Sequence, residues 1–237
     1  MFIFFNLCQV LKRCNGNLQL TGSSLFGIDH LKETKQKENI MILSLSAPLI
    51  LASISPRRRE LLRSIGLTFK VRPAHVDETY FEGETPRAHV RRLACDKAMT
   101  IANKHPSAWV LGADTIVVID GLILGKPKNK RQAREMLERL SNRKHIVFTG
   151  FTIARADTGI LKTRVVQSAV QFKNISPEEM DWYVNCDEPY DKAGGYAVQG
   201  KGACFIKTIR GSYTNVIGLP LCEVMDDMTK LGAVQIR

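Results

Sequence analysis

The spacing of hydrophobic and polar residues becomes regular only beyond residue 46. The first 46 residues combine a short apolar run, a stretch rich in Gly and Ser, and the charged segment HLKETKQKEN, with little periodicity. Segments without such a period do not predict a packed helix or strand. We therefore expect residues 1–46 to be an extension, either disordered or the product of a start codon placed too early. Residues 47–237 are expected to form the folded domain.

From residue 48 onward, short apolar runs alternate with segments of helical spacing. Strands are predicted over residues 49–53, 68–74, 145–156 and 164–175, and a strand followed by a turn over 202–213. A hairpin is predicted over 108–127 with its turn at Asp120-Gly121. Helices are predicted over residues 56–66, 85–104, 129–141 and 176–186, and from about 220 onward. The segment GSYTNVIGLP is expected to be a tight turn. One tight hairpin among helical crossovers predicts an α/β fold around a mixed sheet.

Composition narrows the class of partner. The chain has 237 residues, 44% of them apolar, and no stretch approaches the roughly 20 apolar residues that span a bilayer. Its net charge of +11 suggests an anionic partner, either nucleic acid, nucleotide, phosphorylated metabolite or acidic membrane. The six cysteines form no C-x-x-C pair, and the apolar start lacks a preceding basic segment and a clean cleavage site. Reduced thiols in a cytosolic protein are the simplest interpretation.

Three arginines crowd the first turn of the helix that follows Ser55 and Pro56. The positive end of a helix dipole disfavours the cations Arg57, Arg58 and Arg59 at that place. They either belong to a solvated charged face or form an anion site with the free N–H groups of the helix start. In the second interpretation, the hydroxyl of Ser53 adds a donor, and a bound polyphosphate offsets the repulsion.

Charged residues also interrupt apolar segments elsewhere. Asp114 follows the apolar run WVLGA, so a metal, a cation or backbone donors must solvate its carboxylate. The alternative is a structural Asp that caps a turn or pairs with a lysine. Lys126, just past the hairpin, can return near Asp114. Glu78 lies in an acidic segment whose oxygens suit Mg²⁺ or Mn²⁺, although acidic loops are common. Lys97 shares a helical stripe with apolar residues, so it either snorkels to the surface or points into a cleft.

A glycine-rich run, DKAGGYAVQGKGACFI, follows the helix predicted over 176–186. Its glycines allow close backbone approach to a ligand, and Gln199 offers both a donor and an acceptor for the edge of a base. A flexible loop with turn glycines is the alternative. The run does not match the phosphate-binding pattern G-x-x-x-x-G-K-[ST]. The basic groups suit a polyphosphate, the carboxylates suit a divalent metal, and this glycine-rich run suits a base. A nucleotide hydrolase needs all three.

Several stretches closely resemble the Maf family of nucleoside triphosphate pyrophosphatases. They are LASISPRRRELL, GADTIVVIDGLILGKP with MLERLS, and EPYDKAGGYAVQGKGACFI followed by GSYTNVIGLPL, and the likeness runs from about residue 48 to 227. The resemblance implies a long mixed β-sheet flanked by helices, in two lobes with a central cleft. It also implies hydrolysis of a nucleoside triphosphate to monophosphate and pyrophosphate with Mg²⁺ or Mn²⁺, a cytoplasmic location, and a link to arrest of cell division.

The resemblance also implies a role for each matching residue. Asp114 matches the catalytic base, Lys97 and Lys126 match other active-site positions, and Glu78 with Asp114 would hold the metal. Arg57, Thr115 and Gln199 match positions tied to substrate choice. Gln199, within GGYAVQG, is typical of the branch that prefers dTTP and UTP, whereas the branch that prefers 7-methyl-GTP lacks this glutamine.

The sequence departs from the family pattern at two places, and two alternative functions remain open. Ile54 stands where the family commonly has glycine and could crowd the phosphate loop, and NRKH replaces the usual GxxH. The 7-methyl-GTP branch is one alternative. A basic nucleic-acid-binding protein without catalysis is the other, although no known binding motif is present and a nucleic-acid partner is not expected. A homodimer is left open, and no membrane partner is expected.

Overall fold

The structure is a computed structural model, and it describes residues 43–236. The expectation for residues 1–42 lies outside the described residues. Residues Leu43–Leu45, which the hydrophobic pattern places in the N-terminal extension, form strand β1. This strand pairs antiparallel with the C-terminal strand β9, Val234–Ile236, in a separate two-stranded sheet. The ordered region therefore begins at least as early as Leu43.

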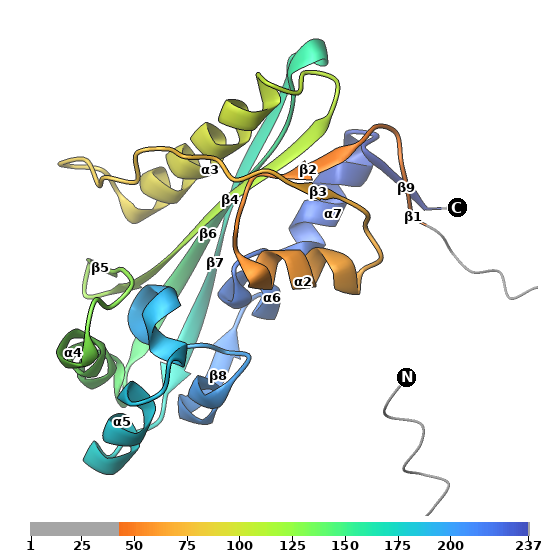
Figure 1. Cartoon of the computed structure of the whole chain (residues 1–237). Coiled ribbons are helices and arrows are strands. Elements are labelled where there is room, and N and C mark those ends of the chain that lie inside the picture. Colours follow the sequence, from red (N-terminus) through yellow and green to blue (C-terminus); the bar gives the residue numbers. More distant parts are fainter. Residues whose placement is uncertain (1–42, 237) are drawn as a thin grey trace, which may run out of the picture. The chain divides into compact units, whose positions relative to one another are not determined.

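The remaining elements alternate between strands and helices (Figure 1). The strands of the main sheet are β2 (Leu49–Leu51), β3 (Lys70–Val71), β4 (Trp109–Ile119), β5 (Leu122–Leu124), β6 (Lys144–Arg155), β7 (Ile160–Phe172) and β8 (Ile206–Arg210). The α-helices are α2 (Pro56–Ser64), α3 (Pro86–Ala102), α4 (Lys130–Leu140), α5 (Pro177–Val184), α6 (Tyr213–Ile217) and α7 (Leu221–Lys230). Short 3₁₀ turns are η2 (Ala156–Thr158), η3 (Glu188–Asp191), η4 (Ala193–Gly195) and η5 (Lys201–Phe205).

The main sheet is mixed, as the hairpin among helical crossovers predicts. Its order is β3-β2-β4-β6-β7-β8, with β5 paired to β4. Strand β2 runs parallel to β3 and β4, and the other pairs are antiparallel. The long strands β4, β6 and β7 cross the fold side by side, with helices packed along them (Figure 1). The predicted α/β class with a long mixed sheet flanked by helices is confirmed.

The predicted helix starts follow from local capping. Ser55, Thr85 and Asn129 each accept a hydrogen bond from a backbone N–H in the first turn of α2, α3 and α4. Ser176 and Glu179 form a reciprocal capping box at α5. These bonds satisfy N–H groups that otherwise have no partner inside the helix. One expectation is wrong: GSYTNVIGLP is not a simple turn, because its residues 213–217 form the short helix α6, capped by Ser212.

Helix α3 lies unusually close to the sheet because two glycines face it. A Cβ atom added at Gly112 of β4 would stand 2.6 Å from the carbonyl oxygen of Ala94, and one at Gly150 of β6 would overlap the carbonyl of Val90. Only glycine leaves room for this contact between backbones. The same packing brings Lys97 of α3 down onto β4.

No described helix is both long and apolar enough to cross a membrane.

Candidate active site

A cleft of about 1440 Å³ opens at one edge of β4. Strand β4 pairs with β2 through Trp109–Leu111 and with β5 through Val117–Ile119, so residues 112–116 have no strand partner on that edge among the described residues. On its other edge, β4 pairs with β6 along this stretch. Successive side chains of a strand point to opposite faces, and both Asp114 and Thr115 line the cleft because this edge is open.

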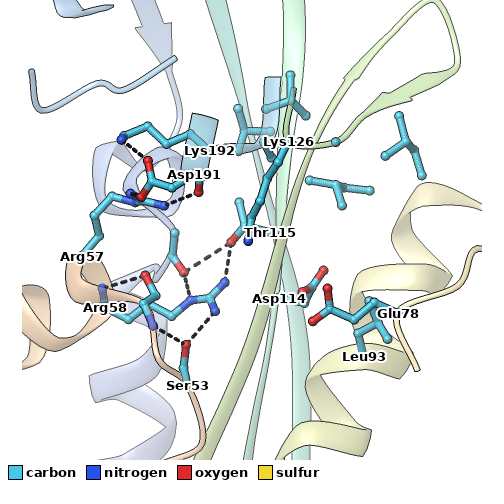
Figure 2. Close-up of a pocket in the computed structure, with 18 of the residues that line it drawn as sticks. Ser53, Arg57, Arg58, Glu78, Leu93, Asp114, Thr115, Lys126, Asp191 and Lys192 are labelled. Carbon is cyan, nitrogen blue, oxygen red and sulfur yellow. Dashed lines mark hydrogen bonds and ion pairs between the residues drawn. The ribbon is translucent and has the colours of Figure 1, made fainter. Parts of the chain in front are cut away.

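On the side of α3, a lysine lies between two carboxylates. Lys97 Nζ is 2.8 Å from Asp114 Oδ1 and 2.6 Å from Glu78 Oε1. Lys97 and Asp114 are buried, whereas the Glu78 side chain is 60% exposed and belongs to the loop before α3. Figure 2 shows the Asp114 and Glu78 carboxylates side by side next to α3. Lys97 therefore points into the cleft and does not snorkel to the surface.

The charge of Glu78 depends on this cluster. Burial by itself would raise the pKa of the Glu78 carboxyl. The hydrogen bond and charge of Lys97 outweigh that effect, with help from the charges of Lys126 and Arg58, and the pKa is lowered. Glu78 is consequently a carboxylate at neutral pH.

On the side of α2, the buried cation is Arg58. Its Nε donates to the Gly218 carbonyl at 2.8 Å, and its two terminal nitrogens donate to Ser53 Oγ at 3.1 Å and Thr115 Oγ1 at 3.0 Å (Figure 2). Burial lowers the pKa of this guanidinium. Thr115 is held further by Thr149 of β6, with the two hydroxyl oxygens 2.9 Å apart. Ser53 and Thr115 are thus joined through one arginine.

Family resemblance singles out Arg57, but Arg58 lies deeper in the cleft. Arg57 donates to Asp191, with its Nη1 2.8 Å from Oδ2 and its Nη2 3.3 Å from the carbonyl oxygen. Lys192 also pairs with Asp191. Burial would raise the pKa of Asp191, but the hydrogen bonds from Lys192 and Arg57 outweigh it and lower the pKa. Arg57 lines the cleft wall while already holding a carboxylate.

A local signal distinguishes the two arginines. The buried residues of α2 are Arg58, Leu61 and Leu62. Residues three and four apart share a helix face, so the leucines place Arg58, and not Arg57, on the buried face. The spacing of Arg58 from these leucines is a sequence signal that could have found it.

Lys126 and Gln199 line the cleft from other segments. Lys126 follows β5, and Gln199 lies between η4 and η5. Both side chains are exposed, and within residues 43–236 neither makes a hydrogen bond or ion pair with another residue. They are free to contact a ligand.

The cleft brings together all the predicted site residues, namely Ser53, Arg57, Glu78, Lys97, Asp114, Thr115, Lys126 and Gln199.

The donors present suit a divalent ion that arrives with a phosphate ligand. Across the described residues, no group of three or more His, Cys, Asp or Glu side chains could hold a metal alone. Glu78 and Asp114 offer two carboxylates on one wall of the cleft. Mg²⁺ is commonly bound by one or two carboxylates, several waters and the phosphates of a substrate. The two residues fit that role, with Lys97 balancing their charge.

The cleft lies at an open sheet edge, with carboxylates and a lysine on one wall and a buried arginine with two hydroxyls on another. Groups of these kinds are chemically suited to a phosphate-bearing ligand. A family model described as Maf-like protein matches residues 48–231, and the chain belongs to this family. It is 57% identical over 190 residues to a dTTP/UTP pyrophosphatase of Syntrophus aciditrophicus, covering 80% of this chain and 93% of that one.

Other relatives carry the same name. A dTTP/UTP pyrophosphatase of Syntrophotalea carbinolica is 45% identical over 79% of this chain and 86% of its own length. That of Myxococcus xanthus is 47% identical over 78% of this chain and 92% of its own. Among solved structures, a HAM1 protein from Coxiella burnetii aligns at a TM-score of 0.38 and 16% identity, covering 53% of this chain and 73% of that one.

Proposed function

We propose that this protein hydrolyses dTTP and UTP to the monophosphate and pyrophosphate. Relatives of 45–57% identity that bear this name support the proposal. The observation that carries it is the buried Lys97–Asp114 pair, which shares one cleft with the buried Arg58. A carboxylate held at a phosphate-binding cleft is equipped to activate water.

Asp114 is the proposed base. Water attacks the α-phosphorus in line with the departing pyrophosphate, and Asp114 accepts the proton of that water. The 2.8 Å contact with Lys97 fixes the orientation of the carboxylate, so that its other oxygen can face the water. Pre-set orientation of this kind lowers the entropic part of the barrier.

The cations of the cleft stabilise the triphosphate and its leaving group. Lys97, Lys126, Arg57 and Arg58 surround the cleft from three segments, and the hydroxyl of Ser53 adds a polar contact. Charge that develops on the leaving pyrophosphate is then met by groups already in place. A magnesium or manganese ion held by Glu78 and Asp114 would neutralise phosphate charge and lower the pKa of a bound water.

Gln199 and Thr115 are the proposed determinants of substrate choice. The amide of Gln199 can donate and accept at the edge of uracil or thymine. Thymine and uracil differ by one methyl group, which is worth only about 1–3 kcal/mol, so one site can accept both. A cytoplasmic location, a homodimer, the clearing of surplus pyrimidine triphosphates and a link to arrest of cell division belong to the same proposal.

The test is a pyrophosphate-release assay with Mg²⁺ or Mn²⁺. The purified protein meets dTTP, UTP, CTP, 7-methyl-GTP, GTP and ATP, and free phosphate is counted in parallel. Pyrophosphate from dTTP and UTP with little free phosphate supports both the cleavage site and the substrate branch. Release mainly from 7-methyl-GTP would overturn the branch and keep the reaction. No release from any nucleotide would overturn the proposed activity.

A further inference from the structure

The carboxylate of Glu188 gathers hydrogen bonds at the end of one loop. Its Oε2 accepts the N–H of Lys201 at 2.9 Å, and its Oε1 accepts the N–H of Gly202, also at 2.9 Å. Oε1 accepts a third bond, from the hydroxyl of Tyr183 at 2.8 Å. Glu188 begins η3 and Lys201 begins η5, so one side chain closes the loop that contains Gln199.

Tyr183 holds the backbone on the other side of Gln199. We call the pair of side chains, Glu188 and Tyr183, the clasp. Its hydroxyl oxygen accepts the N–H of Ala197 at 3.2 Å while its proton goes to Glu188. The tyrosine is fully buried, and its ring packs edge-on against Phe205 at 5.1 Å between centroids. The backbone is thus fixed two residues before Gln199 and two residues after it. Gln199 itself stays exposed on the cleft wall.

Two glycines of the loop serve the clasp. A Cβ atom at Gly200 would overlap the Glu188 carboxylate, and one at Gly202 would stand 2.7 Å from the Tyr183 hydroxyl oxygen. The sequence pattern assigns these glycines to close approach of a ligand. In the structure, the side chains that approach them most closely are those of Glu188 and Tyr183.

The hydrogen bonds to Glu188 are strengthened by the negative charge of its carboxylate. Burial would raise the pKa of this carboxyl, but the amides of Gly202 and Lys201 and the Tyr183 hydroxyl outweigh it, and the pKa is lowered. Hydrogen bonds to an ionised acceptor are about twice as strong as neutral ones. A loop held by several of them loses little freedom when a ligand binds.

We propose that Glu188 and Tyr183 are positioning residues for base recognition, which hold Gln199 at the cleft before the nucleotide arrives. The inference rests on the proposed function, because it assigns the base contact to Gln199. The hydrogen bonds of the Glu188 and Tyr183 side chains go to residues 197, 201 and 202 and to each other, away from the phosphate side of the cleft, where Lys97, Asp114 and Arg58 lie. Loss of the clasp is therefore expected to weaken binding of the base and to spare binding of the polyphosphate.

The first test is Glu188→Gln, which keeps the shape but replaces one acceptor oxygen by an N–H₂ group facing a backbone N–H. We expect KM for UTP to rise about tenfold, as loss of one or two such bonds implies. The kcat and the inhibition constant of base-free tripolyphosphate are expected to stay within about twofold of wild type. Glu179→Gln, which alters a carboxylate in the α5 capping box, is the matched control.

The second test asks whether Glu188 acts through Gln199. Residues that act through one contact show non-additive effects in a double-mutant cycle. In a Gln199→Ala background, Glu188→Gln is expected to raise KM for UTP no further. An undiminished rise there, or an equal loss of tripolyphosphate binding, would overturn the inference. Tyr183→Phe repeats the cycle if Glu188→Gln fails to fold, as judged by its melting temperature.

Failure of the inference differs from failure of the proposed function. If the wild-type protein releases pyrophosphate from UTP and Glu188→Gln has wild-type KM, only the positioning role is overturned. If the wild-type protein releases no pyrophosphate from UTP, the proposed function is overturned and the inference falls with it.

Discussion

At the scale of single residues, the cleft brings together charged side chains whose burial would cost free energy if each were unpaired. Lys97 and Asp114 are both buried, and neither is solvated well enough to stand without the other. Glu78 reaches the same ammonium from an exposed loop. The three charges leave one net negative charge. The other charged residues that line the cleft are Arg57, Arg58, Lys126, Lys192, Asp77 and Asp191. Such a balance suits an anionic ligand that brings its own cation.

Replacing Asp114 by asparagine tests the proposed base. The amide keeps the size of the side chain and still accepts from Lys97, but it is a far weaker proton acceptor. We expect Asp114→Asn to lower kcat for pyrophosphate release on the order of 10²- to 10³-fold in a protein that still folds. Its melting temperature is expected to fall, because the buried Lys97 keeps only the exposed Glu78 as its counter-charge. Asp120→Asn, at the exposed hairpin turn, is the control. Near-wild-type turnover in Asp114→Asn would rule out this residue as the base.

Replacing Arg58 by lysine tests the arginine that the family resemblance does not single out. A lysine keeps the charge but cannot reach Gly218, Ser53 and Thr115 at once, because it has a single nitrogen. We expect Arg58→Lys to lower kcat/KM for UTP at least about tenfold. Arg63→Lys, at the other end of α2, is expected to have no effect. Equal activity in the two variants, measured by pyrophosphate release, would contradict a role for the three-way contact.

At the scale of elements, local sequence signals are sufficient to predict a helix or hairpin whose conformation depends only on its own residues. Ser55, Thr85 and Ser176 each precede a proline and cap the helix that the pattern predicts. What the pattern misses depends on distant partners. Strand β9 has only three residues and exists because β1 pairs with it. The short helix α6 packs where Asn215 bonds to the Val147 carbonyl and to Ser168.

The same limit applies to the candidate site. The residues near Asp114 can be chosen from sequence because apolar runs and family motifs surround them. The role of Glu188 cannot be predicted in this way, because its carboxylate meets Tyr183 of α5 and two amides of η5, and no spacing rule joins these segments. Glu188 opens the family-like stretch EPYDKAGGYAVQGKGACFI, and Gly200 and Gly202 lie within it, but this stretch fits a ligand loop equally well.

The contact between α3 and the sheet gives a prediction for two elements together. A methyl group at Gly150 would run into the Val90 carbonyl and push α3 away from β6. Overpacking of this kind costs about 1–3 kcal/mol, and it also shifts Lys97 relative to Asp114. We expect Gly150→Ala to lower both the free energy of unfolding and kcat. Gly125→Ala, where a Cβ meets nothing within 4 Å, is the stability control in a urea titration.

At the scale of the whole molecule, a buried histidine links stability to pH. His145 lies at the start of β6 in apolar surroundings, edge-on to Phe172 and Tyr196. Its Nε2 is 2.7 Å from the Tyr196 hydroxyl, and its Nδ1 has no hydrogen-bond partner among the described residues. Burial lowers the pKa of His145 from 6.5 to about 4. A second proton would have to sit beside aromatic rings.

The sign of the effect follows from that direction. Because the folded pKa lies below the unfolded value, the unfolded chain binds the proton more tightly. The corresponding stability is present in full well above pH 6.5 and is lost as the pH falls from there towards about 4. Between about pH 7 and about pH 4.5 the loss is expected to be about 2–3 kcal/mol of unfolding free energy.

Urea titrations across this range make the contribution visible. His145→Gln removes the titrating group, so its unfolding free energy is expected to fall less steeply with acid than that of wild type, although the variant is less stable at neutral pH. His105→Gln, at an exposed position, controls for the loss of an ordinary histidine. It is expected to keep the wild-type slope. Parallel slopes for His145→Gln and wild type would show that the buried imidazole is not what makes this fold acid-sensitive over this range.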